Sequence, residues 1–299
     1  MITNQNERNY AGISHYFGLS TDTKPTTTVA NGSDFYEIDT GEKYYFNGET
    51  KAWVQVSTKY LKSIAVSGAT ASYYAGQSFS TTGMTVTATY TDNSTAEISE
   101  GYTITPSGAL TIKDTKVTIT YTENGIARSK DVAITVTRNS LTVPSQSGTL
   151  TYTGSEQTAT FSNYDPTKMT VANIKGTNAG TYKAVFSIID TDTYQWTDTT
   201  TGPKEVSWII SKANATLTLS ESSVSLDSET TTAEVTATTT TTGEITATSS
   251  AESYATVEVD GNTITITRVA AGSATITVAA AGDDNHNAPT SATITVTVT

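Results

Sequence analysis

The chain has 299 residues, a formal net charge of −12 and no cysteine. The acidic balance without any basic run argues against nucleic-acid binding, and the absence of cysteine excludes disulfides and thiolate metal sites. No apolar run is long enough to insert into a membrane. Threonine is abundant, and because it is β-branched and half polar it suits the solvent face of a strand, so we expect an all-β protein of several small domains.

Residues 1–32 are predicted to form an extended N-terminal arm. This polar segment has no strong hydrophobic periodicity, so we expect it to be disordered alone and ordered on contact with a partner. It also lacks the basic and then apolar regions of a secretory signal, and the far end of the sequence stops on an alternating strand, SATITVTVT. For a complete coding sequence, we therefore expect neither export by the usual route nor attachment to a cell wall.

Residues 33–58 predict a three-stranded β-meander with strands in SDFYEID, KYYF and KAWVQV. Thr40-Gly41 and Asn47-Gly48 supply the turn signals. We expect one shared face made of Tyr36, Ile38, Tyr44 and Phe46, with Trp53 or Val54 closing it across the third strand.

Such a small sheet is marginally stable alone, which predicts a docking module whose second layer comes from a larger assembly. The alternative is that it packs on the following domain and does nothing else. The expected docking residues are Phe35, Tyr36, Ile38, Tyr44, Phe46 and Trp53.

The sequence GLSTDTKPTTTVANGSDFYEIDTGEKYYFNGETKAW resembles a stretch common in small structural proteins of tailed bacteriophages. The shared pattern is approximately G-L-S-x-D-x-K-P-x…G-S-x-F-Y-E-x-D-T-G-x-x-Y-x-F-(D/N)-G-x-x-K-x-W, and it covers roughly residues 17–53. The resemblance implies a virion component assembled in the host cytoplasm, which needs no export signal. It implies other virion proteins as partners (capsid, portal or neck, or tail). The marginal N-terminal sheet suits a homo-oligomer in the particle, and from charge and run length we expect neither nucleic-acid binding nor membrane insertion.

Beyond residue 58 the sequence predicts three immunoglobulin-like (Ig-like) β-sandwiches, over residues 59–137, 138–212 and 213–299. Their closing strands are expected at DVAITVT, KEVSWIIS and SATITVTVT. This spacing and the short strands between turn signals are typical of such sandwiches. The links between them are short, so we expect a semi-rigid rod.

The first sandwich contains YYAGQSF and GMTVTATYTDNS, which resemble the bacterial Ig-like pattern Y-x-x-G-x-x-F…G-(M/L)-x-V-x-A-x-Y-x-D-G-S. Asn93 stands where glycine is frequent in that family, and both residues tolerate positive φ. Tyr73 and Tyr74 open a loop and are candidates for exposed aromatic contacts with a surface or glycan.

The second sandwich contains NAGTYKA, which has the form of a tyrosine corner. The Tyr182 hydroxyl is expected to bond back to the backbone, with Ala184 where antibody domains have cysteine. Trp196 and Trp208 are expected in the core.

The third sandwich has a hairpin at VEVDGNTITI, with a primed turn expected at Asp260-Gly261. AGSATITV…GDDNHNA resembles the group-2 bacterial Ig-like family, with His286 where tyrosine is usual.

We recognise no catalytic, cofactor-binding or metal-binding residues in the sequence. We therefore expect that the protein is not an enzyme and binds no cofactor. Its two histidines lie far apart, and no carboxylate pair occurs in a recognisable frame. Asp283-Asp284-Asn285 offers oxygen ligands for Ca²⁺, but it lacks the spaced acidic residues of a calcium loop, so a turn-forming role is favoured.

The sequence therefore predicts a non-enzymatic phage virion structural or decoration protein of the head, neck or tail. The arm and meander anchor it, and the Ig-like domains project for weak attachment to host or environmental surfaces. The alternative is a carbohydrate-binding adhesin or tail-fibre receptor-binding protein that contacts host-surface or mucus glycans.

Overall fold

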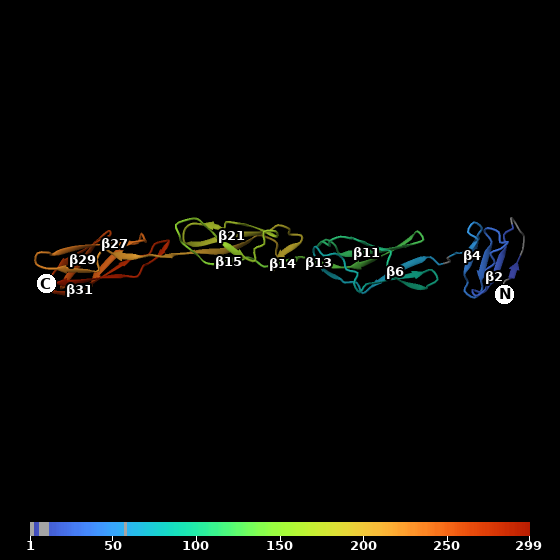
Figure 1. The fold of residues 1–299 in the computed structure, drawn as a ribbon, viewed down its shortest axis with the longest axis horizontal. Coiled ribbons are helices and arrows are strands. Elements are labelled where there is room, and N and C mark those ends of the chain that lie inside the picture. The colour runs from blue at the N-terminus through green and yellow to red at the C-terminus, as the bar shows by residue number, and fades with distance from the viewer. Residues whose placement is uncertain (1–2, 6–11, 57–58) are drawn as a thin grey trace. The chain divides into compact units, whose positions relative to one another are not determined.

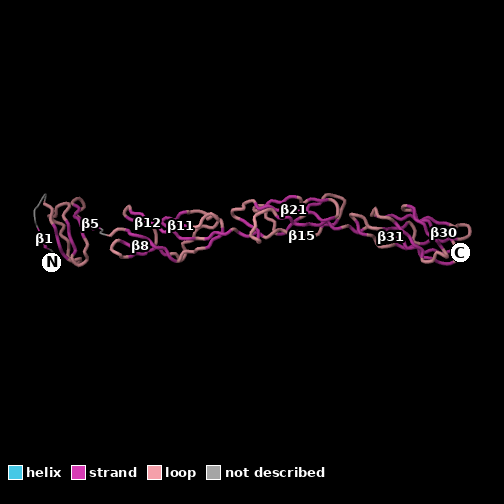
Figure 2. The backbone as a smooth tube through the Cα atoms, turned by 180° about the vertical axis from the view of Figure 1, so that it is seen from behind, coloured by secondary structure: helices cyan, strands magenta, loops and turns pink. Residues whose placement is uncertain are grey.

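The computed structural model describes residues 3–5, 12–56 and 59–299. Every regular element in these residues is a β-strand (Figures 1 and 2), so they contain no helix that could cross a membrane. The all-β prediction is confirmed. The chain divides into two compact units, Met1–Arg138 and Asn139–Thr299, which are described separately.

The first unit begins with a five-stranded sheet, which we call the N-terminal module. Its strands follow chain order across the sheet: β1 (Thr3–Gln5), β2 (His15–Gly18), β3 (Asp34–Glu37), β4 (Lys43–Asn47) and β5 (Ala52–Val56). Strands β3, β4 and β5 form the expected antiparallel meander.

The prediction of an extended arm over residues 1–32 is wrong in its described part, because β2 pairs in parallel with β3. The four-residue strand HYFG is too short to show a period of two in the sequence, and a parallel partner gives no hairpin signal. Residues 1–2 and 6–11 lie outside the described residues.

The first sandwich follows in the same unit. It has a sheet of β6 (Leu61–Ser67), β8 (Thr85–Tyr90) and β9 (Thr95–Ile98), a sheet of β10 (Tyr102–Thr105), β11 (Lys116–Glu123) and β12 (Ile126–Ala133), and a parallel pair of β7 (Ser72–Tyr74) and β13 (Thr135–Thr137). Asn93 lies at φ +67°, in the left-handed region that its place in the turn requires. The β11–β12 hairpin turns on Asn124-Gly125, both at positive φ, as a type I′ turn requires.

The second unit contains the second and third sandwiches. The second has a four-stranded sheet of β16 (Leu150–Thr151), β23 (Lys204–Ser211), β21 (Gly180–Ile188) and β19 (Met169–Ala172). Its short pairs are β14 (Asn139–Leu141) with β22 (Tyr194–Trp196), β15 (Ser145–Ser147) with β18 (Thr160–Ser162), and β17 (Gln157–Thr158) with β20 (Lys175–Gly176).

The third sandwich has two four-stranded sheets. One contains β25 (Leu217–Leu219), β27 (Thr232–Thr239), β30 (Thr263–Arg268) and β29 (Ala255–Asp260), and the other β26 (Ser223–Leu226), β33 (Ala292–Val298), β31 (Gly272–Ala280) and β28 (Ile245–Ser249). A separate short parallel pair is formed by β24 (Ala213–Asn214) and β32 (His286–Asn287). The β29–β30 turn is Gly261-Asn262, one residue later than expected, with Gly261 at φ +59°.

One connection recurs in all three sandwiches: an early strand pairs in parallel with the closing strand. The pairs are β7 with β13, β16 with β23, and β26 with β33. The remaining pairs of the main sheets are antiparallel. A two-sheet sandwich closed in this way is Ig-like, and three of them in tandem confirm the predicted fold class.

Each sandwich has its own buried core. The first core includes Leu61, Leu110 and Ile119, the second is built around Trp196, Trp208 and Phe186, and the third consists of Val, Ile, Leu and Ala. The expected core positions Trp196 and Trp208 are buried, and Tyr90 is buried in the first core. Since the described residues leave no buried side-chain polar atom without a hydrogen-bond partner, these cores hold the sheets together without unpaired polar groups.

Candidate attachment surface

The N-terminal sheet has one face that is buried and built of aromatic side chains. Phe35 and Phe46 are almost completely buried, and the ring of Trp53 lies edge-on to both at centroid distances of 5.8 and 5.2 Å. Tyr16 of β2 contacts the same indole at 5.7 Å. Edge-to-face contacts of this kind stabilise a small aromatic core beyond its buried area.

The segment 19–32, between β2 and β3, supplies the second layer over this face. The Trp53 indole N–H donates to the carbonyl of Pro25 at 2.7 Å. The Lys24 ammonium lies over the rings of Phe35 and Tyr44, 4.9 and 4.2 Å from their centroids. The module therefore closes its own core, and the hypothesis that a partner must supply the missing layer is wrong. The covering role of this segment could not be predicted from the sequence, because a lysine side chain can cover aromatic rings without any hydrophobic periodicity.

An ion pair ties the covering segment to the sheet. Glu37 is 3% exposed and accepts hydrogen bonds from Lys24 and from the Thr40 hydroxyl. These bonds, with one from the Tyr44 hydroxyl, hold the pKa of Glu37 below its ordinary value, and the Lys24 bond has the largest effect. A buried carboxylate is tolerated only when it is paired and hydrogen-bonded in this way.

Several residues that carry the phage resemblance make contacts within the module. Asp22 accepts from the backbone N–H of Leu19, and Asp39 accepts from both the N–H and the hydroxyl of Ser20, at 2.7–2.9 Å. Gly41 lies at φ +75°, a conformation that favours glycine. These pattern residues thus serve the fold of the module, whereas Tyr36 of the same pattern is 40% exposed.

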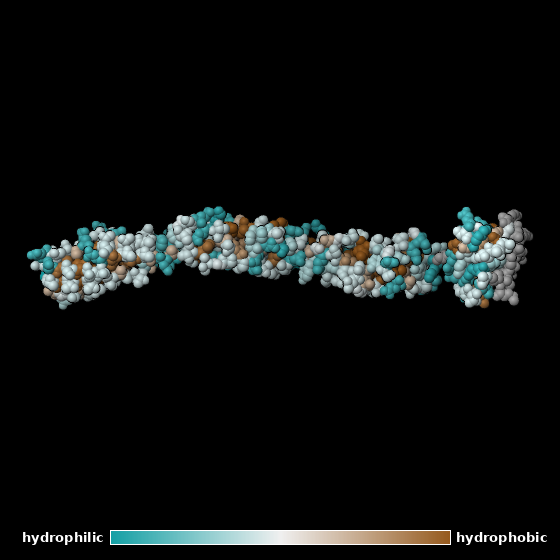
Figure 3. Space-filling model, in the orientation of Figure 1, coloured by the Kyte–Doolittle hydropathy of each residue, from teal (hydrophilic) through white to brown (hydrophobic). Residues whose placement is uncertain are grey.

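The opposite face of the sheet exposes large apolar side chains. Tyr36, Tyr45, Val54 and Ile38 are 40%, 43%, 53% and 61% exposed, and the half-buried Phe17 contacts the Tyr36 ring. We call these five residues the aromatic face. On the side of the molecule drawn in Figure 3, hydrophobic surface forms patches among hydrophilic residues.

Strand register explains why the predicted single face was wrong. Phe35 lies opposite Tyr44, and Phe46 opposite Trp53, so these four share the buried face. Tyr36 and Ile38 alternate with Phe35 and therefore point to the other side. Phe17 and Tyr45 were not predicted as members of the exposed face. Both faces of the sheet carry aromatic residues, so the sequence lacks the usual contrast between apolar and polar positions.

One end of the aromatic face is charged. His15 Nδ1 lies 2.8 Å from Asp34, and Lys43 Nζ lies 3.2 Å from the same carboxylate. The bond to Asp34 raises the pKa of Lys43. Beside Tyr45 and Val54 the surface has an open hollow of about 380 Å³. An apolar centre with a polar margin is the arrangement found at many protein–protein contacts.

The tyrosine candidates in the sandwiches differ in exposure and in role. Tyr73 is only 6% exposed and its hydroxyl accepts from the Ser80 N–H, so its predicted role as a surface contact is wrong. Alternation along β7 turns Tyr73 into the core and leaves Tyr74 55% exposed. The Tyr182 hydroxyl donates to the Asn178 carbonyl at 2.7 Å, the bond that defines a tyrosine corner.

The described residues bring no three His, Asp or Glu side chains together as metal ligands. At the calcium candidate, Asp283 accepts hydrogen bonds from the N–H groups of Asn285 and His286 at 2.8 and 2.7 Å, which is a turn-forming role. His286 packs its ring edge-on against Tyr152 at 5.2 Å.

No protein-family model matches the sequence, and no curated protein matches it. Similar solved structures include surface layer protein SbsC domains 1–6 (16% identity over 82% of this chain and 41% of that chain, TM-score 0.25). They also include the I9–I11 tandem of titin (7% identity over 79% of this chain and 98% of that chain, TM-score 0.22). Drosophila OTK extracellular domains 3–5 are similar at 10% identity over 82% of this chain and 98% of that chain, with a TM-score of 0.30. This chain spans less than half of the SbsC structure.

Proposed function

We propose that the chain is a non-enzymatic structural or decoration protein of a tailed-phage virion, attached to the particle through the aromatic face of its N-terminal module. The observation that carries this proposal is the exposure of Tyr36, Tyr45, Val54 and Ile38 on a module that has already closed its own core. Exposed apolar side chains gathered on one small sheet favour a protein partner.

The sequence pattern of residues 17–53 supports a virion as the larger assembly. The pattern resembles a module of phage structural proteins; Phe35, Phe46 and Trp53 of the pattern build the core of the module, and Tyr36 of the pattern lies on the aromatic face. The aromatic face is the surface that this fold leaves open. The Ig-like sandwiches then project from the attachment point and contact host or environmental surfaces weakly.

Incorporation into particles tests the proposal. The full chain and a variant lacking residues 1–58 are each produced during growth of the phage that encodes the gene, and density-purified particles are probed by immunoblot. We expect the full chain on the particles and the truncated chain in the unbound fraction, with thermal unfolding of the sandwiches unchanged. Particles that carry the truncated chain at the full level would refute the proposal.

Glycan binding is the second candidate, because one hollow on the first sandwich combines aromatic and hydroxyl groups. It measures about 520 Å³ and is lined by Phe79, Tyr102, Thr103, Ile104, Pro106 and Ser107. Aromatic rings and hydroxyls are the groups that stack on and hydrogen-bond to sugars. A glycan array decides it: selective binding that is lost in Tyr102→Ala supports an adhesin, and no selective binding removes this candidate.

A further inference from the structure

The link between the second and third sandwiches is built into the third sandwich. β23 ends at Ser211, and β24 begins at Ala213 and pairs in parallel with β32. The N–H of Ala213 also donates to the Asn285 carbonyl at 2.9 Å. Only Lys212 separates the two elements, so the link has no free length in which to act as a flexible spacer.

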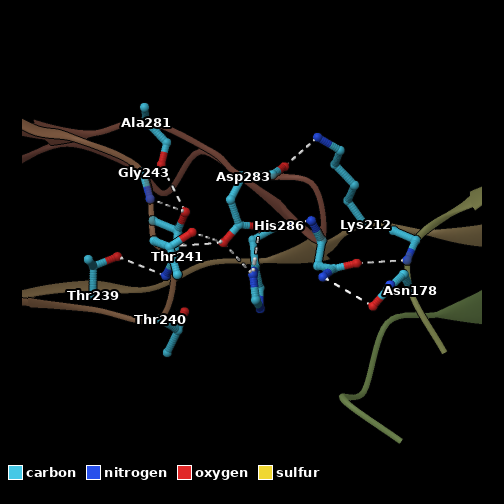
Figure 4. Close-up of polar contacts among 12 residues, drawn as sticks. Asn178, Lys212, Thr239, Thr240, Thr241, Gly243, Ala281, Asp283 and His286 are labelled. Atoms are coloured by element: carbon cyan, nitrogen blue, oxygen red, sulfur yellow. Dashed lines mark hydrogen bonds and ion pairs between the residues drawn. The ribbon is translucent and has the colours of Figure 1, made fainter. Parts of the chain in front are cut away.

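Asp283 holds the loop beside this link in one conformation (Figure 4). Besides the N–H groups of Asn285 and His286, its carboxylate accepts from the N–H of Thr242 at 3.0 Å and contacts the His286 ring nitrogen Nδ1 at 3.0 and 3.1 Å. These donors, the Thr242 N–H first, hold the pKa of the Asp283 carboxyl well below its usual range. A carboxylate with this many donors makes a rigid support for residues 283–286.

From this support the loop reaches back to the second sandwich. The Asn285 side-chain oxygen accepts from the N–H of Ala179 at 2.8 Å, and its amide nitrogen lies 3.5 Å from the Asn178 side-chain oxygen. Lys212 donates to the Asp283 carbonyl, as Figure 4 shows. The edge-on contact between the His286 and Tyr152 rings adds a further contact between the two sandwiches.

The contacted residues of the second sandwich are themselves held firmly. The carbonyl of Asn178 accepts the tyrosine-corner bond from Tyr182. Tyr182 stacks on Trp208 with ring centroids 4.4 Å apart, and Trp208 is completely buried. Asn285 therefore bonds to a part of the second sandwich that is connected to its core rather than to a loose loop.

We propose that the second and third sandwiches form one mechanical unit, joined by a junction clamp of Asn178, Ala179, Lys212, Asp283 and Asn285. Two domains on a short link usually move relative to each other unless an interface restrains them. Here the restraint is polar and directional, and Asn285 is its central residue. In the clamped state the two sandwiches present their surfaces in one fixed arrangement.

The distance distribution between two spin labels, one on each sandwich, tests this directly. The chain has no cysteine, so Thr149→Cys and Ser228→Cys introduce the only two labelling sites, and both positions are exposed. In the full chain, pulsed dipolar spectroscopy should give one narrow distribution. Asn285→Ala should widen it about twofold, because loss of the bonds that restrain a joint populates its open states. Adding Lys212→Gln should widen it further.

Asn287→Ala is the matched control. It also removes an asparagine side chain from this loop, but Asn287 bonds to Asn214 at 3.1 Å within the third sandwich. We expect the parent width in this control, and unchanged Trp196 and Trp208 fluorescence in every variant as a check of folding. A broad distribution in the parent, or equal widths in the Asn287→Ala control and the double clamp variant, would overturn the proposal.

Discussion

The N-terminal module and the third sandwich use the same alternation of strand residues but place different side chains on the outside. In β31 the buried residues Ala274, Ile276 and Val278 alternate with threonines that face solvent. In β3 the buried Phe35 and Glu37 alternate with the exposed Tyr36, and the exposed Ile38 comes directly after the end of the strand. One strand hides its apolar residues, and the other carries them on both faces.

This difference separates what folds a sheet from what a sheet offers to a partner. Threonine on the outer face of a strand supports the extended backbone and is well solvated, so it needs no further contact. Tyrosine, isoleucine and valine on the outer face of the module leave apolar area in water although the core beneath is complete. That area is the physical basis of the proposed attachment.

The largest expected effect comes from the buried side of the module. Phe35→Ala should reduce the free energy of unfolding of the module by about 3–5 kcal/mol, because it leaves a cavity in a small aromatic core. The NMR signal of the Trp53 indole N–H, which depends on the bond to Pro25, reports the loss. The Trp196 and Trp208 indole signals serve as internal references in the second sandwich. An unchanged melting midpoint of the Trp53 signal would show that the core assignment is wrong.

Truncation of a core residue to alanine in the third sandwich should act on that sandwich alone. Ile276→Ala is expected to cost about 2–5 kcal/mol, whereas Thr275→Ala on the neighbouring solvent-facing position stays within about 0.5 kcal/mol. Denaturant unfolding of the full chain, followed by hydrogen exchange of the β31 amides, measures both. Similar costs at the two positions would contradict the inward and outward assignment.

Acid should weaken the module through Glu37. Its pKa in the folded chain lies below the ordinary value of 4.5, so its stabilising contribution is present above that value and is lost as pH falls through the folded value. We expect the Trp53 indole signal to melt at lower temperature at about pH 3 than at about pH 6. Glu37→Gln, which cannot titrate, should make this difference smaller. An equal acid sensitivity in the variant would place the titrating group elsewhere.

A smaller effect is expected at the tyrosine corner. Tyr182→Phe keeps the ring on Trp208 and removes only the hydroxyl bond to Asn178, which should cost about 1 kcal/mol in the second sandwich. Thermal unfolding followed by Trp208 fluorescence measures it, with Tyr164→Phe as a control at a half-buried tyrosine of the same core. No difference between the two variants would mean that the corner bond adds nothing to stability.

Sequence reasoning succeeded where one face of each strand is polar. The third sandwich alternates threonine with Val, Ile and Ala, so strands such as SATITVTVT and the VEVDGNTITI hairpin could be predicted from periodicity and turn residues. The fold class followed from the same alternation and from turn residues such as Gly261.

It failed where periodicity carries no information. Runs such as Tyr44-Tyr45-Phe46 are apolar at every position, so the register and the buried face depend on pairing with β3, which the sequence does not display. The covering segment depends on one lysine that lies over rings, and β2 is too short for any pattern. Tyr73 and Tyr74 are identical residues side by side, and only the orientation of β7 separates the buried one from the exposed one.

The most direct test of the attachment hypothesis measures how many copies of the full chain each purified particle carries. Tyr36→Ser combined with Tyr45→Ser removes the centre of the aromatic face without touching the buried core. Tyr74→Ser combined with Tyr254→Ser removes two exposed tyrosines from the sandwiches as a matched control. We predict at least about a tenfold loss of particle-bound chain in the first pair, because buried aromatic anchors dominate protein contacts, and the parent level in the second. Parent-level incorporation of the Tyr36/Tyr45 variant would contradict the account.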